Sequence, residues 1–207
     1  MKATDLHWPR IAVVGSGISG LAAAHGLKDH ARVTLYEAGA YFGGHTHTVD
    51  VTLPDASGQP VRHGVDTGFL VFNQKTYPGL MRMFGELGVA ISPSDMSFSV
   101  QVPNAFGRRT LEWPMLGCIW SCPTDQMLRF PVATMVRFCH NHGLIQVNDR
   151  PQWLTVKGGA KNYVEKILAG LTDTRLRTPV TRVVRDEQGV WVHTLQSVER
   201  YDEVVLA

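Results

Sequence analysis

The residues best suited to chemistry are three glycines and one acidic residue near the amino terminus. Residues 11–20 read IAVVGSGISG, and Glu37 follows the first of these glycines by 22 positions. Gly15 suits a tight turn, Gly17 lets the backbone approach a pyrophosphate, and Gly20 lets a helix pack closely against a strand. This spacing predicts a dinucleotide-binding loop.

The helix that begins after this loop would complete a phosphate site. Its amino end offers unpaired N–H groups and the positive end of the helix dipole to phosphate oxygens, and Ile18 and Ser19 of the loop are expected to bind the cofactor with it. Glu37 follows the second apolar run, residues 33–36, where its carboxylate can accept hydrogen bonds from an adenosine ribose. A 2′-phosphate at the same place would be repelled.

The apolar pattern predicts the strands and helices that hold these residues. Residues 11–14 and 33–36 are expected to be strands on either side of a helix at 21–28. Residues 174–177 and a buried strand at 203–207 are expected to join them in one parallel sheet, which a hairpin would cover. The other predicted elements are a turn at 54–58, a β segment at 61–73, short strands and turns over 92–123, helices at 77–87, at 125–142 and around Val164, Ile167, Leu168 and Leu171, and hairpin strands at 180–185 and 190–194.

The composition narrows the class of protein. The chain has 207 residues, of which 44% are hydrophobic and 18% charged, so it can bury a core. A net charge of +2 argues against nucleic acid as a partner. No apolar run reaches the ~20 residues of a membrane span, and no signal region precedes the first strand. Three cysteines without framework spacing predict a cytoplasmic protein.

Several segments, in order along nearly the whole chain, resemble the flavin amine oxidase and phytoene desaturase superfamily, in particular its bacterial branch of predicted NAD/FAD-binding proteins. These segments are VVGSGISGLAAAHGL, YEAGAYFGGHTHT, VDTGFLVFNQKTYPGL, LGV, SDMSFSV, WLTVKGGAKNYVEKI, TPVTRVV and YDEVVLA. The resemblance implies an α/β fold, namely a Rossmann-like, doubly wound FAD-binding domain with an inserted α+β substrate-domain portion. Residues 1–58 would begin the FAD-binding domain, residues 59–155 would form the insertion, and residues 156–207 would return to the first domain.

A second glycine pair, Gly43-Gly44, favours FAD over NAD as the cofactor. FAD binds in an extended form, so a glycine pair beyond Glu37 can let backbone N–H groups approach the far side of the pyrophosphate and the ribityl chain. NAD-binding folds do not need glycines there. His45, which follows the pair, is expected to donate a hydrogen bond to the cofactor phosphates.

The resemblance extends the cofactor site to later parts of the chain. It implies that the backbone of Val180 contacts the adenine and that Thr67, Gly68 and Phe69 line the flavin ring. The predicted cofactor-binding residues are Gly15, Gly17, Ile18, Ser19, Gly20, Glu37, Ala38, Gly43, Gly44, His45, Thr46, Thr67, Gly68, Phe69 and Val180.

The function implied is that of an FAD-dependent oxidoreductase. Its substrate would give a hydride to the flavin, while the protein orients the cofactor and excludes water. No protein acid or base is obligatory in such a site, so no catalytic residue is assigned. The substrate is expected to be a small molecule, either an amine or an unsaturated lipid or isoprenoid. Amine oxidases carry arginines where this chain has Gly39 and His45, and this difference tilts the expectation toward a hydrophobic substrate.

Two rival functions belong to other classes. One is a truncated, non-catalytic FAD-binding module, which a genuine stop after Ala207 would favour. A chain seldom ends at the last residue of a core strand, so these 207 residues are expected to be the first part of a longer protein. The other is an NAD-dependent dehydrogenase, against which the second glycine pair speaks. The sequence leaves the oligomeric state open.

Other reactive residue types have simpler interpretations. His45 with His47, and His140 with His142, could each chelate a metal, but no third or fourth ligand follows at metal spacing, so no metal is predicted. Cys139 is expected in the core, and Asp66 is expected to stabilise a turn. The aromatic and basic segment 106–138 could contact a membrane or a lipid, or could be the interior of a substrate domain.

Overall fold

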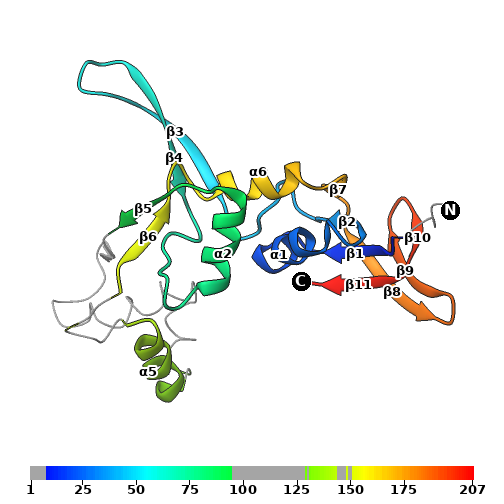
Figure 1. Ribbon diagram of the computed structural model, residues 1–207. Coiled ribbons are helices and arrows are strands. Elements are labelled where there is room, and N and C mark those ends of the chain that lie inside the picture. Colours follow the sequence, from blue (N-terminus) through cyan, green and yellow to red (C-terminus); the bar gives the residue numbers. More distant parts are fainter. Residues whose placement is uncertain (1–7, 95–128, 130, 144–147, 149–150) are drawn as a thin grey trace, which may run out of the picture. The chain divides into compact units, whose positions relative to one another are not determined.

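The computed structural model describes residues 8–94, 129, 131–143, 148 and 151–207 (Figure 1). The chain divides into two compact units. The first contains residues 1–70, 79–92 and 155–207, and the second contains residues 71–78 and 93–154.

The first unit is built on a four-stranded parallel sheet in the order β11-β1-β2-β7. Its strands are β1 (Arg10–Val14), β2 (Arg32–Tyr36), β7 (Asp173–Arg175) and β11 (Glu203–Leu206). Apolar side chains on both faces of β1 and β2 are buried, as expected for central strands of a parallel sheet. The expected α/β, Rossmann-like fold is therefore confirmed, and the two later strands join the parallel sheet as expected.

A helix packs on this sheet and in turn contacts a second helix (Figure 1). Helix α1 (Ile18–Leu27) joins β1 to β2 and buries Gly20, Leu21 and Ala24. It contacts β1, β2 and β11, and it also contacts α6 (Lys161–Ala169). Helix α2 (Pro78–Leu87) buries Met83 and Phe84, and the Phe84 ring lies 5.0 Å from the ring of Tyr163 on α6.

A three-stranded antiparallel sheet packs on the parallel sheet. It consists of β8 (Val180–Asp186), β9 (Gly189–Thr194) and β10 (Val198–Tyr201). Val192 and Tyr201 form a buried cluster with Ala12 and Tyr36 of the parallel sheet. The predicted hairpin over residues 180–194 is confirmed, but β10 was not predicted.

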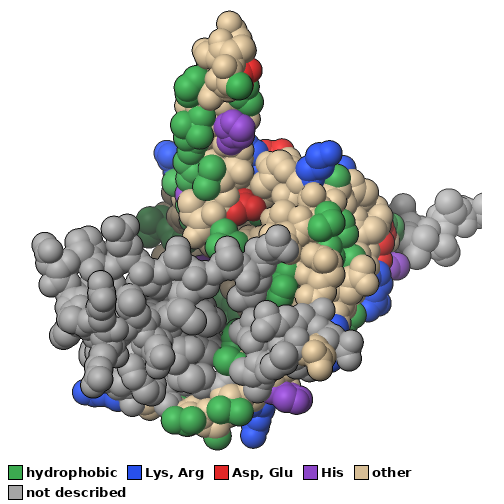
Figure 2. All heavy atoms as spheres, turned by 90° about the vertical axis from the view of Figure 1, so that its left-hand side faces the viewer, with side chains coloured by type: hydrophobic (Ala, Val, Ile, Leu, Met, Phe, Trp, Pro, Cys, Tyr) green, Lys and Arg blue, Asp and Glu red, His purple; other side chains and the backbone are tan. Residues whose placement is uncertain are grey.

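An antiparallel hairpin follows the second glycine pair. Its strands are β3 (Thr48–Pro54) and β4 (Pro60–Asp66), and the predicted turn lies between them. Asp55 shapes this turn, because one of its oxygens accepts hydrogen bonds from the amides of Ser57 and Gln59. Figure 2 shows hydrophobic side chains along the hairpin at the top of the view. Its exposed large apolar residues are Val49, Leu53, Val61 and Val65.

The second unit contains helix α5 (Val132–Asn141) and a bridge between Phe72 and Leu154, whose amides and carbonyls exchange two hydrogen bonds. Strands β5 (Ile91–Ser94) and β6 (Trp153–Val156) pair, and each crosses the division between the units. No helix in the described part of the chain is long and apolar enough to cross a membrane.

Three expectations about the elements need correction. The β segment expected at 61–73 ends at Asp66, because the next amides bond to the His45–His47 segment instead of continuing the ladder. The strand at the end of the chain lies at an edge of the sheet, and the side chain of its Leu206 is 69% exposed rather than buried. The helix expected from 125 is described only from Val132, with Pro131 as its N-cap.

Some predictions fall outside the described residues. They include most of the short strands expected over 92–123, most of the aromatic segment 106–138, and Cys118 and Cys122. The domain boundaries at residues 58 and 155 stay predictions. Cys139 is described, and it is only half-buried on α5.

Candidate cofactor site

The glycine loop has the geometry that its spacing predicts. Gly15 has φ = +101°, and a Cβ there would lie 2.3 Å from the carbonyl oxygen of Ala207. A Cβ on Gly20 would lie 1.9 Å from the carbonyl oxygen of Gly15. These two glycines are thus required by close packing of the loop, the helix and the sheet.

Gly17 differs from these two because it faces open space. A Cβ at Gly17 would meet no atom within 4 Å, and its φ of −61° suits any residue. The fold therefore does not require glycine at this position. A ligand that must approach the backbone closely is a sufficient reason for glycine here.

The amino end of α1 is available to an anion. Its N-cap, Gly17, makes no side-chain cap hydrogen bond, and the first turn contains no acidic residue. The exposed Ile18 and Ser19 begin this turn. Because the first amides of a helix need external acceptors, this end can bind phosphate oxygens.

The Glu37 carboxylate is already oriented by neighbouring donors. Its Oε1 accepts a hydrogen bond from the Gly39 amide at 2.6 Å, and its Oε2 accepts one from the Ser16 amide at 3.0 Å. Burial disfavours the charged form, but hydrogen bonds from the Ser16 hydroxyl and from these amides outweigh burial and lower the pKa of Glu37. Glu37 is thus an ionised acceptor beside the loop.

The second glycine pair lies against the first loop. Gly43 and Gly44 have φ values of +120° and +59°. A Cβ on Gly44 would lie 3.1 Å from Cα of Gly17, and the Gly43 amide donates a hydrogen bond to the Ser16 carbonyl at 3.1 Å. The two glycine segments therefore lie against each other, while the Cβ direction of Gly17 stays open.

The segment Thr67–Phe69 is held beside His45 and His47. The Phe69 amide donates to the His45 carbonyl at 3.2 Å, and the Thr67 amide donates to the His47 carbonyl at 2.8 Å. A Cβ on Gly68 would lie 1.9 Å from the His45 carbonyl oxygen, so only glycine allows this approach. The structure therefore brings these predicted residues together, while their contact with a flavin ring stays a prediction.

Thr46 lies in this region but its side chain is engaged elsewhere. It is buried, and its hydroxyl hydrogen-bonds to the hydroxyl of Tyr163 on α6. Thr46 could therefore contact a cofactor only through its backbone.

Ala38 and the start of β8, which carries Val180, adjoin Glu37. Ala38 is exposed, and Val180, the first residue of β8, packs against the cluster that contains Tyr36. Two backbone bonds hold the start of β8 here, from the Thr178 amide to the Glu37 carbonyl at 2.8 Å and from the Arg177 amide to the Gly39 carbonyl at 3.1 Å.

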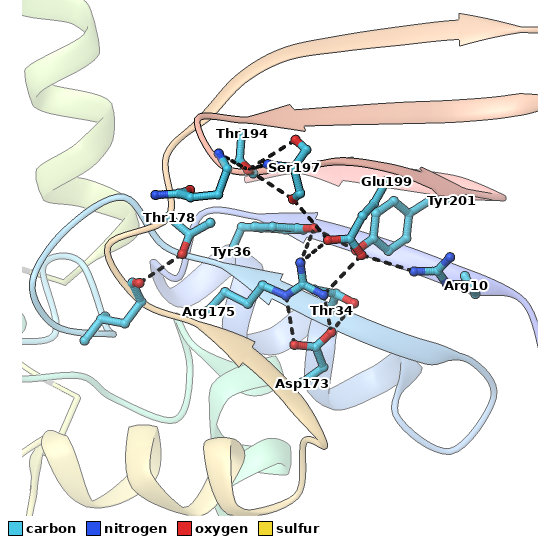
Figure 3. Close-up of polar contacts among 12 residues, drawn as sticks. Arg10, Thr34, Tyr36, Asp173, Arg175, Thr178, Thr194, Ser197, Glu199 and Tyr201 are labelled. Carbon is cyan, nitrogen blue, oxygen red and sulfur yellow. Dashed lines mark hydrogen bonds and ion pairs between the residues drawn. The ribbon is translucent and has the colours of Figure 1, made fainter.

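A network of charged and aromatic side chains supports this end of the sheet (Figure 3). Arg175 donates to both oxygens of Asp173, at 3.0 and 2.9 Å, and also to both oxygens of Glu199. It donates to the Tyr36 hydroxyl at 3.2 Å as well, and Tyr36 hydrogen-bonds to Tyr201 at 2.7 Å. Since Tyr36 immediately precedes Glu37, this network fixes the strand that carries the acidic residue.

Other candidate residues have structural partners. Both oxygens of Asp66 accept the Ala160 amide, at 2.9 and 3.1 Å, which ties β4 to the start of α6. His140 and His142 lie at the end of α5, where a ring nitrogen of His142 lies 2.9 Å from the Phe138 carbonyl oxygen.

Sequence reasoning overlooked Ser16. Its side chain is fully buried between the first two glycines of the loop, and it contacts Glu37 and Gly43. A polar residue between two glycines was the available signal, but the residues it contacts lie 21 and 27 positions away.

The parallel sheet, the glycine loop and the acidic residue after β2 define a Rossmann-like dinucleotide-binding fold. Comparison with known proteins agrees, because a model of NAD(P)-binding Rossmann-like domains matches residues 13–87 and a model of flavin containing amine oxidoreductases matches residues 119–207. No curated protein sequence matches the chain. The chain therefore resembles the amino-terminal portion of the flavin amine oxidase superfamily.

Solved structures share the fold over almost the whole chain. Cyclohexylamine oxidase from Brevibacterium oxydans IH-35A is 22% identical with a TM-score of 0.59, and the match covers 97% of this chain and 58% of that one. A protein assigned as a protoporphyrinogen oxidase from Exiguobacterium sp. 255-15 is 18% identical with a TM-score of 0.57, and the match covers 96% and 59%. A CLA-producing fatty acid isomerase from P. acnes is 15% identical with a TM-score of 0.57, and the match covers 96% and 58%. The chain thus spans less than two thirds of each structure.

The family implies a flavin cofactor, and the residues present fit one. The open side of Gly17, the uncapped end of α1 and the ionised Glu37 are suited to a pyrophosphate and a ribose. When bound, a flavin would supply an acceptor for a hydride.

Proposed function

We propose that this chain is the FAD-binding portion of an oxidoreductase. The observation that carries the proposal is the close approach of Gly44 to Gly17, because it brings the second glycine pair against the loop that we assign to the pyrophosphate. Two adjoining glycine segments suit the extended FAD molecule.

The reaction we propose is transfer of a hydride from a small-molecule substrate to the flavin. An amine and an unsaturated lipid or isoprenoid are both substrate classes that suit such a flavin enzyme. The relatives in fold include an amine oxidase and a fatty acid isomerase, which is in keeping with both classes. We assign no protein acid or base, and the residues of this chain bind and orient the cofactor.

Location and partners are part of the same proposal. We propose a cytoplasmic protein without a nucleic-acid partner, on the basis of the odd cysteine count and the net charge of +2. A peripheral contact with a membrane is the alternative for a hydrophobic substrate.

Binding of FAD to the purified chain is the direct test, and two glycine-to-alanine variants sharpen it. Gly17→Ala should fold normally, because the new Cβ meets no atom within 4 Å, but it should abolish or greatly weaken FAD binding by entering the space of the pyrophosphate. Gly26→Ala on the same helix is the matched control, since its Cβ also meets no atom within 4 Å and it lies away from the loop.

The measurement is the visible flavin spectrum after FAD is added and the excess removed. Wild type and Gly26→Ala should retain flavin, and Gly17→Ala should not. Retention of flavin by Gly17→Ala would refute the assigned pyrophosphate site. A wild-type chain that takes up no FAD but binds NADH would favour an NAD-dependent dehydrogenase. The match to NAD(P)-binding Rossmann-like domains is compatible with that alternative.

A further inference from the structure

Ser16 uses every polar group it has to contact the two other segments of the site. Its amide donates to Oε2 of Glu37 at 3.0 Å, and its hydroxyl bonds to the same oxygen. The Gly43 amide donates to both the carbonyl of Ser16, at 3.1 Å, and its Oγ, at 3.2 Å. Ser16 is 0% exposed, so no solvent competes for these bonds.

The direction of these hydrogen bonds follows from chemistry. An ionised carboxylate only accepts, so the single hydroxyl proton of Ser16 must point to Glu37. The lone pairs of Oγ are then free to accept the Gly43 amide. Two hydrogen bonds therefore follow one another, from the Gly43 amide to Ser16 Oγ and from the Ser16 hydroxyl to Glu37. Hydrogen bonds in such a series strengthen each other.

We propose that Ser16 is a positioning residue, whose hydroxyl orients the Glu37 carboxylate and anchors the Gly43–Gly44 pair against the first loop. The inference deepens the proposed function and rests on it, because the groups that Ser16 positions are those assigned to the ribose and the pyrophosphate of FAD. Alanine at this position would leave Glu37 with one donor fewer, and the Gly43 amide with only the Ser16 carbonyl.

A double-mutant cycle on FAD affinity tests whether Ser16 acts through Glu37. Ser16→Ala should raise the dissociation constant of FAD about tenfold in the wild-type background, the size expected for a hydrogen bond to a charged group. In the Glu37→Ala background the same substitution should cost about twofold or less, because the hydroxyl has already lost its acceptor. Equal losses in the two backgrounds would overturn the proposal. Ser57→Ala, at the tip of the β3–β4 hairpin, is the matched control and should leave FAD affinity unchanged.

Hydrogen exchange of the cofactor-free protein tests the second contact of Ser16, the hydrogen bond from the Gly43 amide. The Gly43 amide should exchange at least about threefold faster in Ser16→Ala, as expected for loss of a hydrogen bond near 1 kcal/mol. It should also exchange faster in Glu37→Ala, which changes neither acceptor of the Gly43 amide but releases the Ser16 hydroxyl. The Gly170 amide at the end of α6 is the internal reference and should not change.

These two readouts separate the inference from the proposed function. If the wild-type chain binds no FAD, the proposed function fails, and the exchange rate of Gly43 still decides the role of Ser16. If Ser16→Ala does not melt cooperatively, that variant is not folded. The exchange rate of the Gly43 amide in Glu37→Ala, which retains Ser16, then decides whether Ser16 is a positioning residue. An unchanged Gly43 exchange rate in the folded variants overturns the positioning role.

Discussion

Glu37 is an acceptor whose two oxygens already have donors within the protein. Its Oε1 accepts the Gly39 amide, and its Oε2 accepts the Ser16 amide and hydroxyl. The donors from Ser16 and Gly39 hold the carboxylate in one orientation before any ligand arrives. A ribose would therefore meet a preorganised acceptor, which lowers the entropic cost of binding.

Glu37→Ala should weaken FAD binding by about 1.5–3 kcal/mol, the range for a hydrogen bond to a charged group. Titration of the flavin spectrum at neutral pH measures the change in dissociation constant. Glu187→Ala in the exposed β8–β9 turn is the control of equal charge, and it should bind FAD like the wild type. Unchanged affinity in Glu37→Ala would place the ribose elsewhere.

Among the elements, Arg175 is one of the residues that join the parallel sheet to the antiparallel one. It lies on β7, and its partners Asp173 and Glu199 come from β7 and β10. Its side chain is 28% exposed, so its ion pairs are better shielded than those of a surface arginine. Its removal would leave two half-buried carboxylates without their main donor.

Arg175→Met should lower the free energy of unfolding by about 1–3 kcal/mol, because partly buried charges lose their partner. Arg185→Met is a matched control, since the Arg185–Glu203 pair is about 60% exposed on each side. A surface pair of this kind contributes only about 0–1 kcal/mol. Urea denaturation measures both variants, and equal losses would contradict the special role of Arg175.

The same network makes stability depend on pH. The Arg175 guanidinium lowers the pKa of Glu199, with a smaller contribution from the Ser197 hydroxyl. Burial acts against ionisation of Asp173, but hydrogen bonds from Arg175 and Thr34 outweigh it and lower its pKa. Because both pKa values are lower in the folded state, this stabilisation is complete above the unfolded-state values near ~4 and is lost as pH falls through the folded-state values.

Urea midpoints between pH 7 and pH 3 should therefore fall less steeply in Arg175→Met than in the wild type. The variant has already lost the favourable environment of Glu199 and Asp173, so protonation of these groups costs it less. Arg10 also lies near Glu199, at 3.4 Å, and should preserve part of the pH dependence. Parallel curves for the two proteins would show that other carboxylates control acid unfolding.

Local sequence signals were sufficient for the central elements and insufficient for contacts between distant segments. The apolar runs before Gly15 and Glu37 predicted β1 and β2, because burial on both faces leaves a continuous apolar run. Strand β10 reads VERY and carries no such run, and its Tyr201 is buried in a cluster with Ala12, Tyr36 and Val192, which come from other strands. The role of Ser16 was hidden for the same reason, since its partners come from two other segments.

At the scale of the whole molecule, a ligand that binds the folded chain should stabilise all of the parts that form the site. FAD at about 100 times its dissociation constant should add about 2.7 kcal/mol of stability. For a chain of this length that corresponds to a rise in melting temperature of about 5–10 °C. A thermal melt with FAD and with NADH measures it, and a shift with NADH alone would contradict the FAD assignment.

The pairing of β1 with β11 also has a consequence during synthesis on the ribosome. The Arg10 amide donates to a carboxylate of Asp202, and these two residues are separated by 192 positions. At about 5–20 residues per second, β1 leaves the ribosome roughly 10–40 s before its β11 partner is made. During that interval the apolar edge of β1 is unpaired, so nascent chains of this protein should be clients of ribosome-associated chaperones until β11 emerges.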